Sequence, residues 1–265
     1  MKRVLSILSL LIYFTALLAC QKEKALPTGQ WIDLSYEFSN QTIYWPTSDP
    51  FQLETVFSGK TEQGYYYAAN KFSAAEHGGT HVDAPLHFAE GHRSLDQIPI
   101  QQLIAAAIKI DVSRKALNNR DYLITVEDLT NWEGQNGAIP NNAILFLYTG
   151  YCQYWPDRVK YLGTDKRGTE GVAELHFPGL HPDAARWLVE NRKLSAIGLD
   201  TASIDYGQSQ RFESHQVLAS ENIPIFENVA QLDKLPSKGA IAIALPIKIK
   251  GGSGGPLRLV ALIPE

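Results

Sequence analysis

The segment HGGTHVDAPLH, which runs from His77 to His87, places three histidines and an aspartate close together in the chain. Two glycines and a proline interrupt it, and a continuous helix is unfavourable with these residues in its interior. We therefore predict a turn followed by an extended strand. His81 and Asp83 would then point to the same face of the strand, and His77 would approach them from the turn.

Imidazole and carboxylate groups in this arrangement are typical ligands of a divalent transition metal. We predict His77, His81 and Asp83 as metal ligands, with Zn²⁺ as the first choice and Mn²⁺ as the alternative. Three protein ligands leave open positions at the metal, as a catalytic site requires. His87 follows Pro85 and is predicted to be the catalytic acid or base, with a fourth ligand as the alternative. A polar surface loop would also contain histidines, but it would not explain why four of the 7 in the chain lie between His77 and His92.

Apolar runs on both sides of this segment predict a fold with more strands than helices. We expect strands at residues 104–112, 143–148, 195–199, 240–245 and 257–263, and helices at 125–132, 181–192 and 216–222. This pattern indicates an α/β or α+β class with a mixed sheet. Residues 155–178 are polar and contain glycine, so we expect a long functional loop there.

The N-terminus has the pattern of a bacterial lipoprotein signal peptide. A short basic stretch precedes an apolar run that ends in Leu-Leu-Ala-Cys at Cys20 and is too short to cross a membrane comfortably. We predict a signal peptide at residues 1–20, a tether at 21–29 and one domain at 30–265. Lipid on Cys20 would hold the protein to a membrane in the cell envelope, at the periplasmic face or the outer membrane. An ordinary signal peptide or an uncleaved anchor is the alternative.

The composition excludes some classes of function. A net charge of −4 at pH 7 and a pI near 6.0 provide no basic face, so we expect no nucleic-acid partner. With Cys20 modified, Cys152 has no partner for an internal disulfide. Its aromatic neighbours indicate a structural residue rather than a nucleophile.

The frame HxGTHxDxPxH resembles the signature of the cyclase family, which includes bacterial kynurenine formamidases and isatin hydrolases. The resemblance extends over Ile32-Asp33-Leu34-Ser35, Trp45-Pro46, GLDTASIDYG at residues 198–207, the run at 214–236 and the closing IKGGSGGPLRLVAL. It implies an α/β, swivelling β/β/α cyclase-like fold with a mixed sheet in a single domain. It also implies a homodimer or a larger homo-oligomer.

The resemblance also implies roles for individual residues. His77, His81 and Asp83 match metal ligands, and His87 matches the catalytic acid or base. His215 and Glu227 match a second metal site, so one or two ions would bind. In relatives with one metal these two residues instead hydrogen-bond in the pocket. The local sequence by itself favours an ordinary half-buried histidine at position 215 and a capping or solvated carboxylate at 227.

Aromatic residues near the segment are candidates for a substrate pocket. We predict Trp45 and Phe88 in this role and consider the run Tyr65–Tyr67 for it as well, with ordinary core packing as the alternative. The remaining histidines, at 92, 176 and 181, are expected to be structural. The glycine run at 251–255 forms either an anion cradle or a tight turn before the last strand.

The reaction that the resemblance implies is hydrolysis of the C–N amide bond of a small aromatic substrate. The two candidates are arylformamidase-like deformylation of N-formylkynurenine and isatin-type opening of a lactam ring. One alternative is a metal-dependent lyase, dehydratase or lactonase at the same site. The other is a non-catalytic lipoprotein that binds a metal or a solute.

Overall fold

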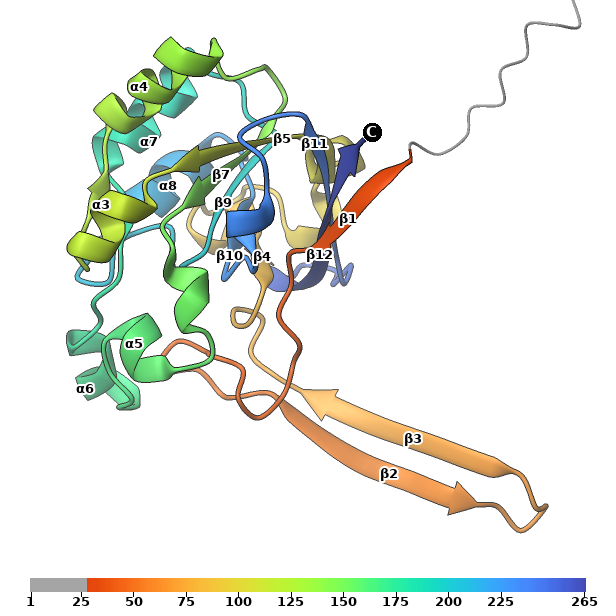
Figure 1. Ribbon diagram of the computed structural model, residues 1–265. Coiled ribbons are helices and arrows are strands. Elements are labelled where there is room, and N and C mark those ends of the chain that lie inside the picture. Colours follow the sequence, from red (N-terminus) through yellow and green to blue (C-terminus); the bar gives the residue numbers. More distant parts are fainter. Residues whose placement is uncertain (1–27) are drawn as a thin grey trace, which may run out of the picture. The chain divides into compact units, whose positions relative to one another are not determined.

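The computed structural model describes residues 28–265, so the predicted signal peptide, Cys20 and most of the tether lie outside the described residues. The main sheet has the strand order β1-β12-β11-β5-β7-β9-β10-β4 (Figure 1). Its strands are β1 (Gly29–Asp33), β4 (His81–Asp83), β5 (Ile104–Asp111), β7 (Ile144–Tyr148), β9 (Ala196–Leu199), β10 (Ile225–Glu227), β11 (Ala240–Pro246) and β12 (Gly254–Pro264). β4 also pairs with β12, so all of these strands except β1 form a closed ring.

The sheet is mixed, as predicted. β5, β7, β9 and β10 pair in parallel, whereas the pairs that close the ring through β4, β12 and β11 are antiparallel. A short parallel pair, β6 (Leu123–Ile124) with β8 (Gly179–Leu180), lies outside this sheet. The five strands expected from apolar runs are all present, with ends shifted by a few residues.

β7 shows why an uninterrupted apolar run becomes a central strand. Ile144 and Phe146 pack into the core inside the ring, and Leu145 and Leu147 pack into the core under the helices. All four side chains are fully buried because successive residues of a strand point to opposite faces. Burial of each side chain stabilises the fold by about 1.5–3 kcal/mol relative to exposure.

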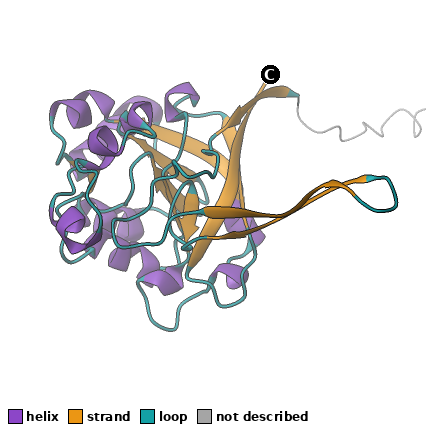
Figure 2. Ribbon diagram, turned by 90° about the horizontal axis from the view of Figure 1, so that it is seen from below, coloured by secondary structure: helices purple, strands orange, loops and turns teal. Residues whose placement is uncertain are grey.

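Most of the helices gather on one side of the sheet (Figure 2). The α-helices of residues 28–265 are α2 (Ile100–Leu103), α3 (Ser113–Asn118), α4 (Val126–Asn136), α5 (Arg158–Leu162), α6 (Gly168–Ala173), α7 (Pro182–Asn191) and α8 (Glu213–Ser220). The expected helix starts are confirmed where capping signals mark them. Thr125 and Asp128 form a capping box at α4, and the His181 side chain accepts a hydrogen bond from the backbone N–H of Asp183 at α7.

The prediction of one long loop at residues 155–178 was wrong, because α5 and α6 lie within it. Asp157 caps the first turn of α5, and Gly163 ends that helix in the left-handed conformation. Tyr161 and Leu162 are buried against Phe177 in a small separate core. The segment looked like a loop because its few buried residues alternate with many solvated ones.

A long hairpin, which no sequence signal predicted, projects from the main sheet (Figures 1 and 2). It consists of β2 (Gln52–Lys60) and β3 (Tyr66–Ser73). The run Tyr65–Tyr67 lies at its turn and is exposed, and it lines no part of the cavity described below. The pocket role considered for these three tyrosines was therefore wrong.

Candidate metal centre

The predicted turn and strand are present. Gly79 has a φ of +57°, which glycine adopts without the strain that a side chain would add. The chain then enters β4, where Val82 faces the core and the side chains of His81 and Asp83 point together to the other face. β4 is paired on both edges, with β10 and β12, so its backbone is fixed within the ring.

Close packing against the last strand fixes the position of His77. Gly254 begins β12 and lies opposite Asp83 in the ladder. A Cβ atom on Gly254 would lie 2.4 Å from Cε1 of His77 and 2.6 Å from the carbonyl oxygen of Val82, so only glycine fits there. The glycine run at 251–255 thus lets β12 approach the cluster closely. It agrees with the prediction of a tight turn before the last strand and not with that of an anion cradle.

Three imidazole rings direct one nitrogen each towards the same carboxylate. His77 Nδ1 lies 2.6 Å from Oδ1 of Asp83, and His81 Nε2 lies 3.2 Å from the same oxygen. His215 Nε2 lies 3.1 Å from Oδ2 of Asp83 and 3.1 Å from Oε1 of Glu227. The structure therefore brings the residues at 77, 81, 83, 215 and 227 into one cluster.

The opposite nitrogen of each ring has its own partner. His81 Nδ1 donates to the carbonyl oxygen of Gly79 at 2.9 Å, and His215 Nδ1 donates to Oδ2 of Asp205 at 2.7 Å. His77 Nε2 is 2.9 Å from Oγ of Ser253. That hydroxyl in turn donates to Glu76, so it accepts from His77. With these N–H groups facing outward, the inner nitrogen of each neutral ring carries a lone pair.

Lone pairs that face carboxylate oxygens need a cation between them. The donor atoms of His77, Asp83 and His87 all lie within 4.8 Å of one another, as do those of His81, Asp83 and Glu227. The buried Nε2 of His81 has no hydrogen-bond partner among residues 28–265, although Asp83 and Glu227 lie close to it. The residues present therefore fit a divalent metal, with Asp83 common to both sets.

The electrostatics of the cluster lead to the same conclusion. Burial disfavours a charge on His215, but hydrogen bonds to Asp205, Asp83 and Glu227 outweigh it and raise its pKa well above the usual value. Burial also raises the pKa of Glu227, and the charge of Asp83 adds to this effect. A group of carboxylates that raises the pKa of buried histidines also favours a metal ion, which binds in exchange for protons.

His87 is placed differently from the other histidines. It ends the 3₁₀ turn Pro85–His87 and is the most exposed member of the cluster. Its ring stacks on that of His77, with centroids 3.8 Å apart, and meets the ring of Phe88 edge-on at 4.5 Å. Burial of its ring faces lowers the pKa of His87 to about 4, and the neighbouring histidines add to this effect, although Asp83 opposes it. The ring is therefore neutral at pH 7 and can accept a proton.

A cavity of about 240 Å³ opens beside the cluster. It is lined by Ile43, Tyr44, Trp45, Ser48, His77, Gly78, His81, Asp83, His87, Phe88, Ala202, Ser203, Phe212, His215, Glu227 and Asn228. Trp45 and Phe88, the two residues predicted for a substrate pocket, both line this cavity. Phe212 contacts both rings, with centroid distances of 6.1 Å to Trp45 and 5.6 Å to Phe88. Trp45, Phe88 and Phe212 form an aromatic wall of the cavity, and this wall borders the histidines directly, because Phe88 stacks on His215 with centroids 4.2 Å apart.

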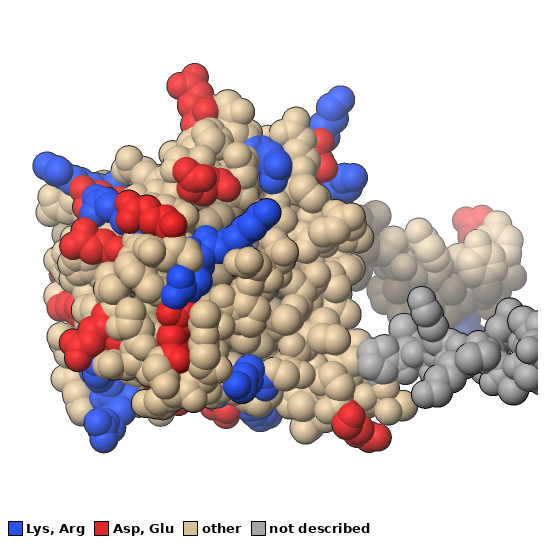
Figure 3. Space-filling view, turned by 90° about the horizontal axis from the view of Figure 1, so that it is seen from above, with Lys and Arg blue, Asp and Glu red and all other residues tan. Residues whose placement is uncertain are grey.

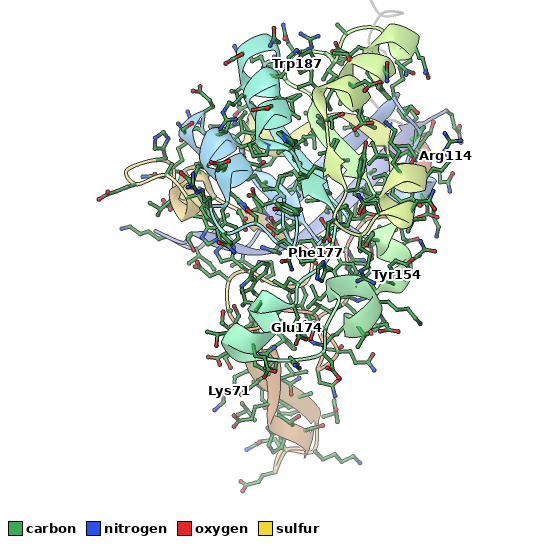
Figure 4. The ribbon with its side chains drawn as sticks, turned by 90° about the vertical axis from the view of Figure 1, so that its left-hand side faces the viewer. Lys71, Arg114, Tyr154, Glu174, Phe177 and Trp187 are labelled. Atoms are coloured by element: carbon green, nitrogen blue, oxygen red, sulfur yellow. The ribbon has the colours of Figure 1, made fainter. Side chains whose placement is uncertain are left out.

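The helical segment α5–α6 supports the aromatic wall. Phe177, which follows α6, meets Trp45 edge-on at 6.4 Å, and the backbone N–H of Gly168 donates to the carbonyl oxygen of Pro46. Figure 4 shows Phe177 between the helices of the main body and α6, which carries Glu174 at its end. This segment therefore contributes to the shape of the cavity, although it supplies no lining residue.

Sequence reasoning assigned no role to several residues of this site. Asp205 holds His215 through its side chain and also accepts hydrogen bonds from the backbone N–H groups of residues 214 and 215. Phe212 has a φ of +52°, a strained conformation for a phenylalanine at the start of a helix that carries a candidate ligand. Both residues lie in or beside segments that carried the family resemblance, but nothing in their local pattern indicated a role.

Other sequence expectations concern the rest of the chain. Burial raises the pKa of the Cys152 thiol to about 12, in keeping with a structural residue. On the face shown in Figure 3, basic and acidic side chains are interspersed, without a continuous basic patch. No helix within residues 28–265 has the length and apolar character that crossing a membrane requires.

Comparison with known proteins identifies similar chains. A family model described as a putative cyclase matches residues 32–206. The isatin hydrolase of Roseibium aggregatum is 34% identical over 210 residues, which are 76% of this chain and 77% of that protein. A kynurenine formamidase of Bacillus cereus is 29% identical over 89% of this chain and 98% of its own.

Solved structures show the same likeness. Isatin hydrolase A from Labrenzia aggregata, bound to benzyl benzoate, aligns with a TM-score of 0.80 and 30% identity over 89% of this chain and 94% of its own. An isatin hydrolase bound to the product analogue thioisatinate aligns with a TM-score of 0.79 and 29% identity over 89% of this chain and 93% of its own. The predicted cyclase-like fold is therefore confirmed.

Proposed function

The chain belongs to the cyclase family of metal-dependent hydrolases, and from this premise we propose that it opens the ring of a small aromatic lactam of the isatin type. The observation that carries the proposal is the cavity, which is lined both by the rings of Trp45, Phe88 and Phe212 and by the cluster around Asp83. A planar bicyclic amide would contact the rings and present its carbonyl to the cluster. Similarity to two isatin hydrolase structures supports this choice.

We propose Zn²⁺ as the metal, with Mn²⁺ as the alternative, and His77, His81, Asp83, His215 and Glu227 as the residues that hold one or two ions. When bound there, the ion would supply Lewis-acid chemistry for the amide carbonyl and for the attacking water. The outer partners of the histidine rings aim the inner nitrogens at the site, and a bound ion would displace any proton from them. The buried cluster excludes bulk water on its inner side.

His87 carries the proton in this scheme. Its neutral ring accepts a proton from the attacking water and returns that proton to the departing nitrogen, which converts the amide into a carboxylate and an amine. Its place at the exposed side of the cluster puts the ring at the cavity, where water and substrate would meet. A merely metal-binding protein would need no neutral imidazole there.

The test is the assay of purified protein with isatin and with N-formylkynurenine, under identical metal loading. We expect isatin to be hydrolysed with the higher kcat/KM. A higher kcat/KM for N-formylkynurenine would make deformylation, and not ring opening, the reaction of this protein. Hydrolysis of lactones alone would contradict the proposal that the substrate is an amide. His81→Ala serves as the inactive control, because it removes a buried candidate ligand without touching the aromatic wall.

We further propose that the protein is a homodimer and that the β2–β3 hairpin forms the contact. The hairpin exposes many apolar side chains: Leu53, Val56, Phe57, Tyr65, Tyr66, Tyr67 and Phe72. Its five aromatic residues are between 40% and 67% exposed. They offer on the order of 500 Å² of surface, and a standard interface buries about 800 Å² per partner. An isolated two-stranded hairpin is marginally stable in water, so a second copy would stabilise it.

The double variant Val56→Ser and Tyr66→Ser tests the dimer by sedimentation velocity. We expect it to sediment as a monomer while the wild type sediments as a dimer. Val159→Ser is the matched control, because Val159 is similarly exposed but lies on α5. A wild-type monomer at micromolar concentration would contradict the proposal.

We also propose that the mature protein is lipid-anchored through Cys20 in the cell envelope, as the N-terminal pattern indicates. In a bacterial host the full-length chain should then fractionate with membranes, and Cys20→Ala should move it to the soluble fraction. Cys152→Ala is the control and should leave the fractionation unchanged. Membrane association that survives Cys20→Ala would point to an uncleaved anchor instead.

A further inference from the structure

A second cleft, of about 660 Å³, lies next to the loop that forms the aromatic wall. It is lined by Asn40, Gln41, Thr42, Pro50, Pro156, Arg158, Asp165 and Arg167. It shares no lining residue with the catalytic cavity, although residues 40–50 contribute to both. The two spaces therefore lie against the same short segment of chain.

The charges of this cleft are unbalanced. Two guanidinium groups, of Arg158 and Arg167, line it together with the single carboxylate of Asp165, and neither forms a salt bridge within residues 28–265. Arg158 is half buried and is held by one long hydrogen bond from Nη1 to the carbonyl oxygen of Tyr44, at 3.5 Å. Its Nη2 has no acceptor within the described residues. Burial lowers the pKa of Arg158, and the charge of Arg167 adds to this effect.

A guanidinium pair in this state is suited to an anion. Two forks of N–H donors can bind one carboxylate in bidentate fashion, and such charge-assisted hydrogen bonds are among the strongest available. Because Asp165 cancels one of the two positive charges, the cleft has a net charge near +1. That balance favours a monoanion over the dianionic form of phosphate.

We propose that this cleft binds a small monocarboxylate and thereby adjusts the catalytic cavity. Arg158 donates to the carbonyl oxygen of Tyr44, and Arg167 donates to that of Ser48. Both carbonyls belong to residues that line the cavity. A carboxylate that draws the guanidiniums towards itself weakens these two contacts and so alters the wall that holds the substrate.

The source of the ligand follows from the chemistry of the reaction, and this step rests on the proposed function. Opening of a lactam yields a carboxylate, so the product itself carries the group that the cleft would recognise. Bound there, the product would lower the affinity of the cavity for further substrate. Because the cleft lies outside the cavity, both sites can be occupied at once, so the rise in KM would reach a limit at high product concentration.

Benzoate binding, measured by isothermal titration calorimetry on the holoenzyme, tests the site. We expect Arg158→Gln with Arg167→Gln to weaken the binding at least about tenfold, since two charge-assisted contacts are lost. Arg114→Gln is the control, because this exposed arginine lies on α3, away from the α6 region marked by Glu174 (Figure 4). The thermal midpoint of the double variant without benzoate checks that it is folded.

His81→Ala separates the cleft from the catalytic cluster. It should retain the arginine-dependent binding of benzoate, because it changes only the cavity. Unchanged benzoate affinity in the double arginine variant would overturn the proposal, as would arginine-dependent binding of inorganic phosphate in preference to benzoate. Arginine-dependent benzoate binding in a protein that hydrolyses no amide would keep the site and overturn the proposed function.

Discussion

Oδ2 of Asp205 lies 2.7 Å from Nδ1 of His215, and this contact fixes which nitrogen of the ring faces Asp83. Both side chains are buried, so the pair is shielded from exchange with water. A carboxylate behind a metal-binding imidazole orients the ring and increases its basicity. The metal centre thus depends on Asp205, which holds the ring of His215 in place from the side away from Asp83.

Asp205→Asn should weaken metal binding because the amide can present its N–H to His215 and turn the ring to the wrong tautomer. We expect a loss of about 10- to 100-fold in metal affinity, read by competition with a chromogenic chelator. Excess metal should restore most of the activity. Asp183→Asn, at an exposed aspartate of α7, should leave the affinity unchanged; an equal loss there would show a general charge effect.

His87→Ala should separate catalysis from metal binding. The variant should retain its metal content, whereas kcat should fall by about 10²- to 10⁴-fold because no base accepts the proton of water. Metal analysis and steady-state kinetics on the same preparation provide the measurement. Full activity with metal retained would remove His87 from the mechanism, and loss of metal would make it a ligand.

Gly254→Ala should disrupt the cluster through packing alone. The added methyl group would collide with His77 and with the backbone of Val82, and relief requires β12 to move away from β4. We expect a loss of about 1–3 kcal/mol in the free energy of unfolding. Gly134→Ala, inside α4 with open space around it, should be neutral or stabilising by up to about 1 kcal/mol. Equal behaviour of the two variants in urea unfolding would refute the steric argument.

Asp128 should make the stability of the fold dependent on pH in the acid range. Burial opposes its ionisation, but hydrogen bonds from Lys115, Thr125 and Tyr122 outweigh it and lower its pKa. Its stabilisation is therefore fully present above the unfolded pKa of about 3.9 and is lost as the pH falls through the folded value.

Asp128→Asn should lower the free energy of unfolding by about 1–3 kcal/mol at pH 7. The variant should also lose less stability than the wild type as the pH falls below 4. Urea unfolding at several pH values measures both effects. Glu127→Gln, the exposed neighbour on α4, should keep the acid dependence of the wild type. A variant at position 128 with the same pH profile as the wild type would contradict the assignment.

Local patterns predicted those parts of the structure whose causes are local. The apolar run of β7 and the capping box at Thr125 indicated a buried strand and a helix start, and both are confirmed. The hairpin was missed because its apolar residues face solvent within this chain, so no pattern of burial marks its strands. The short helices α5 and α6 were missed because only a few anchors, such as Tyr161, are buried.

The same distinction applies to the residues of the metal centre: some could be predicted from the local sequence and others could not. His77, His81 and Asp83 could be grouped from spacing alone because one turn and one strand bring them together. Glu227 reaches the cluster because β10 pairs with β4 and places it opposite His81, a register that the local sequence does not show. His215 depends on Asp205 and on the start of α8. Its inclusion rested on the family resemblance.

The account as a whole depends on a divalent metal at Asp83. The most direct test is elemental analysis of gently purified protein, followed by chelation, reconstitution with Zn²⁺ or Mn²⁺ and assay with isatin at each stage. We predict at least one transition-metal ion per chain, with activity that disappears on chelation and returns on reconstitution. Protein that contains no transition metal, gains none on reconstitution and still hydrolyses isatin would contradict the account.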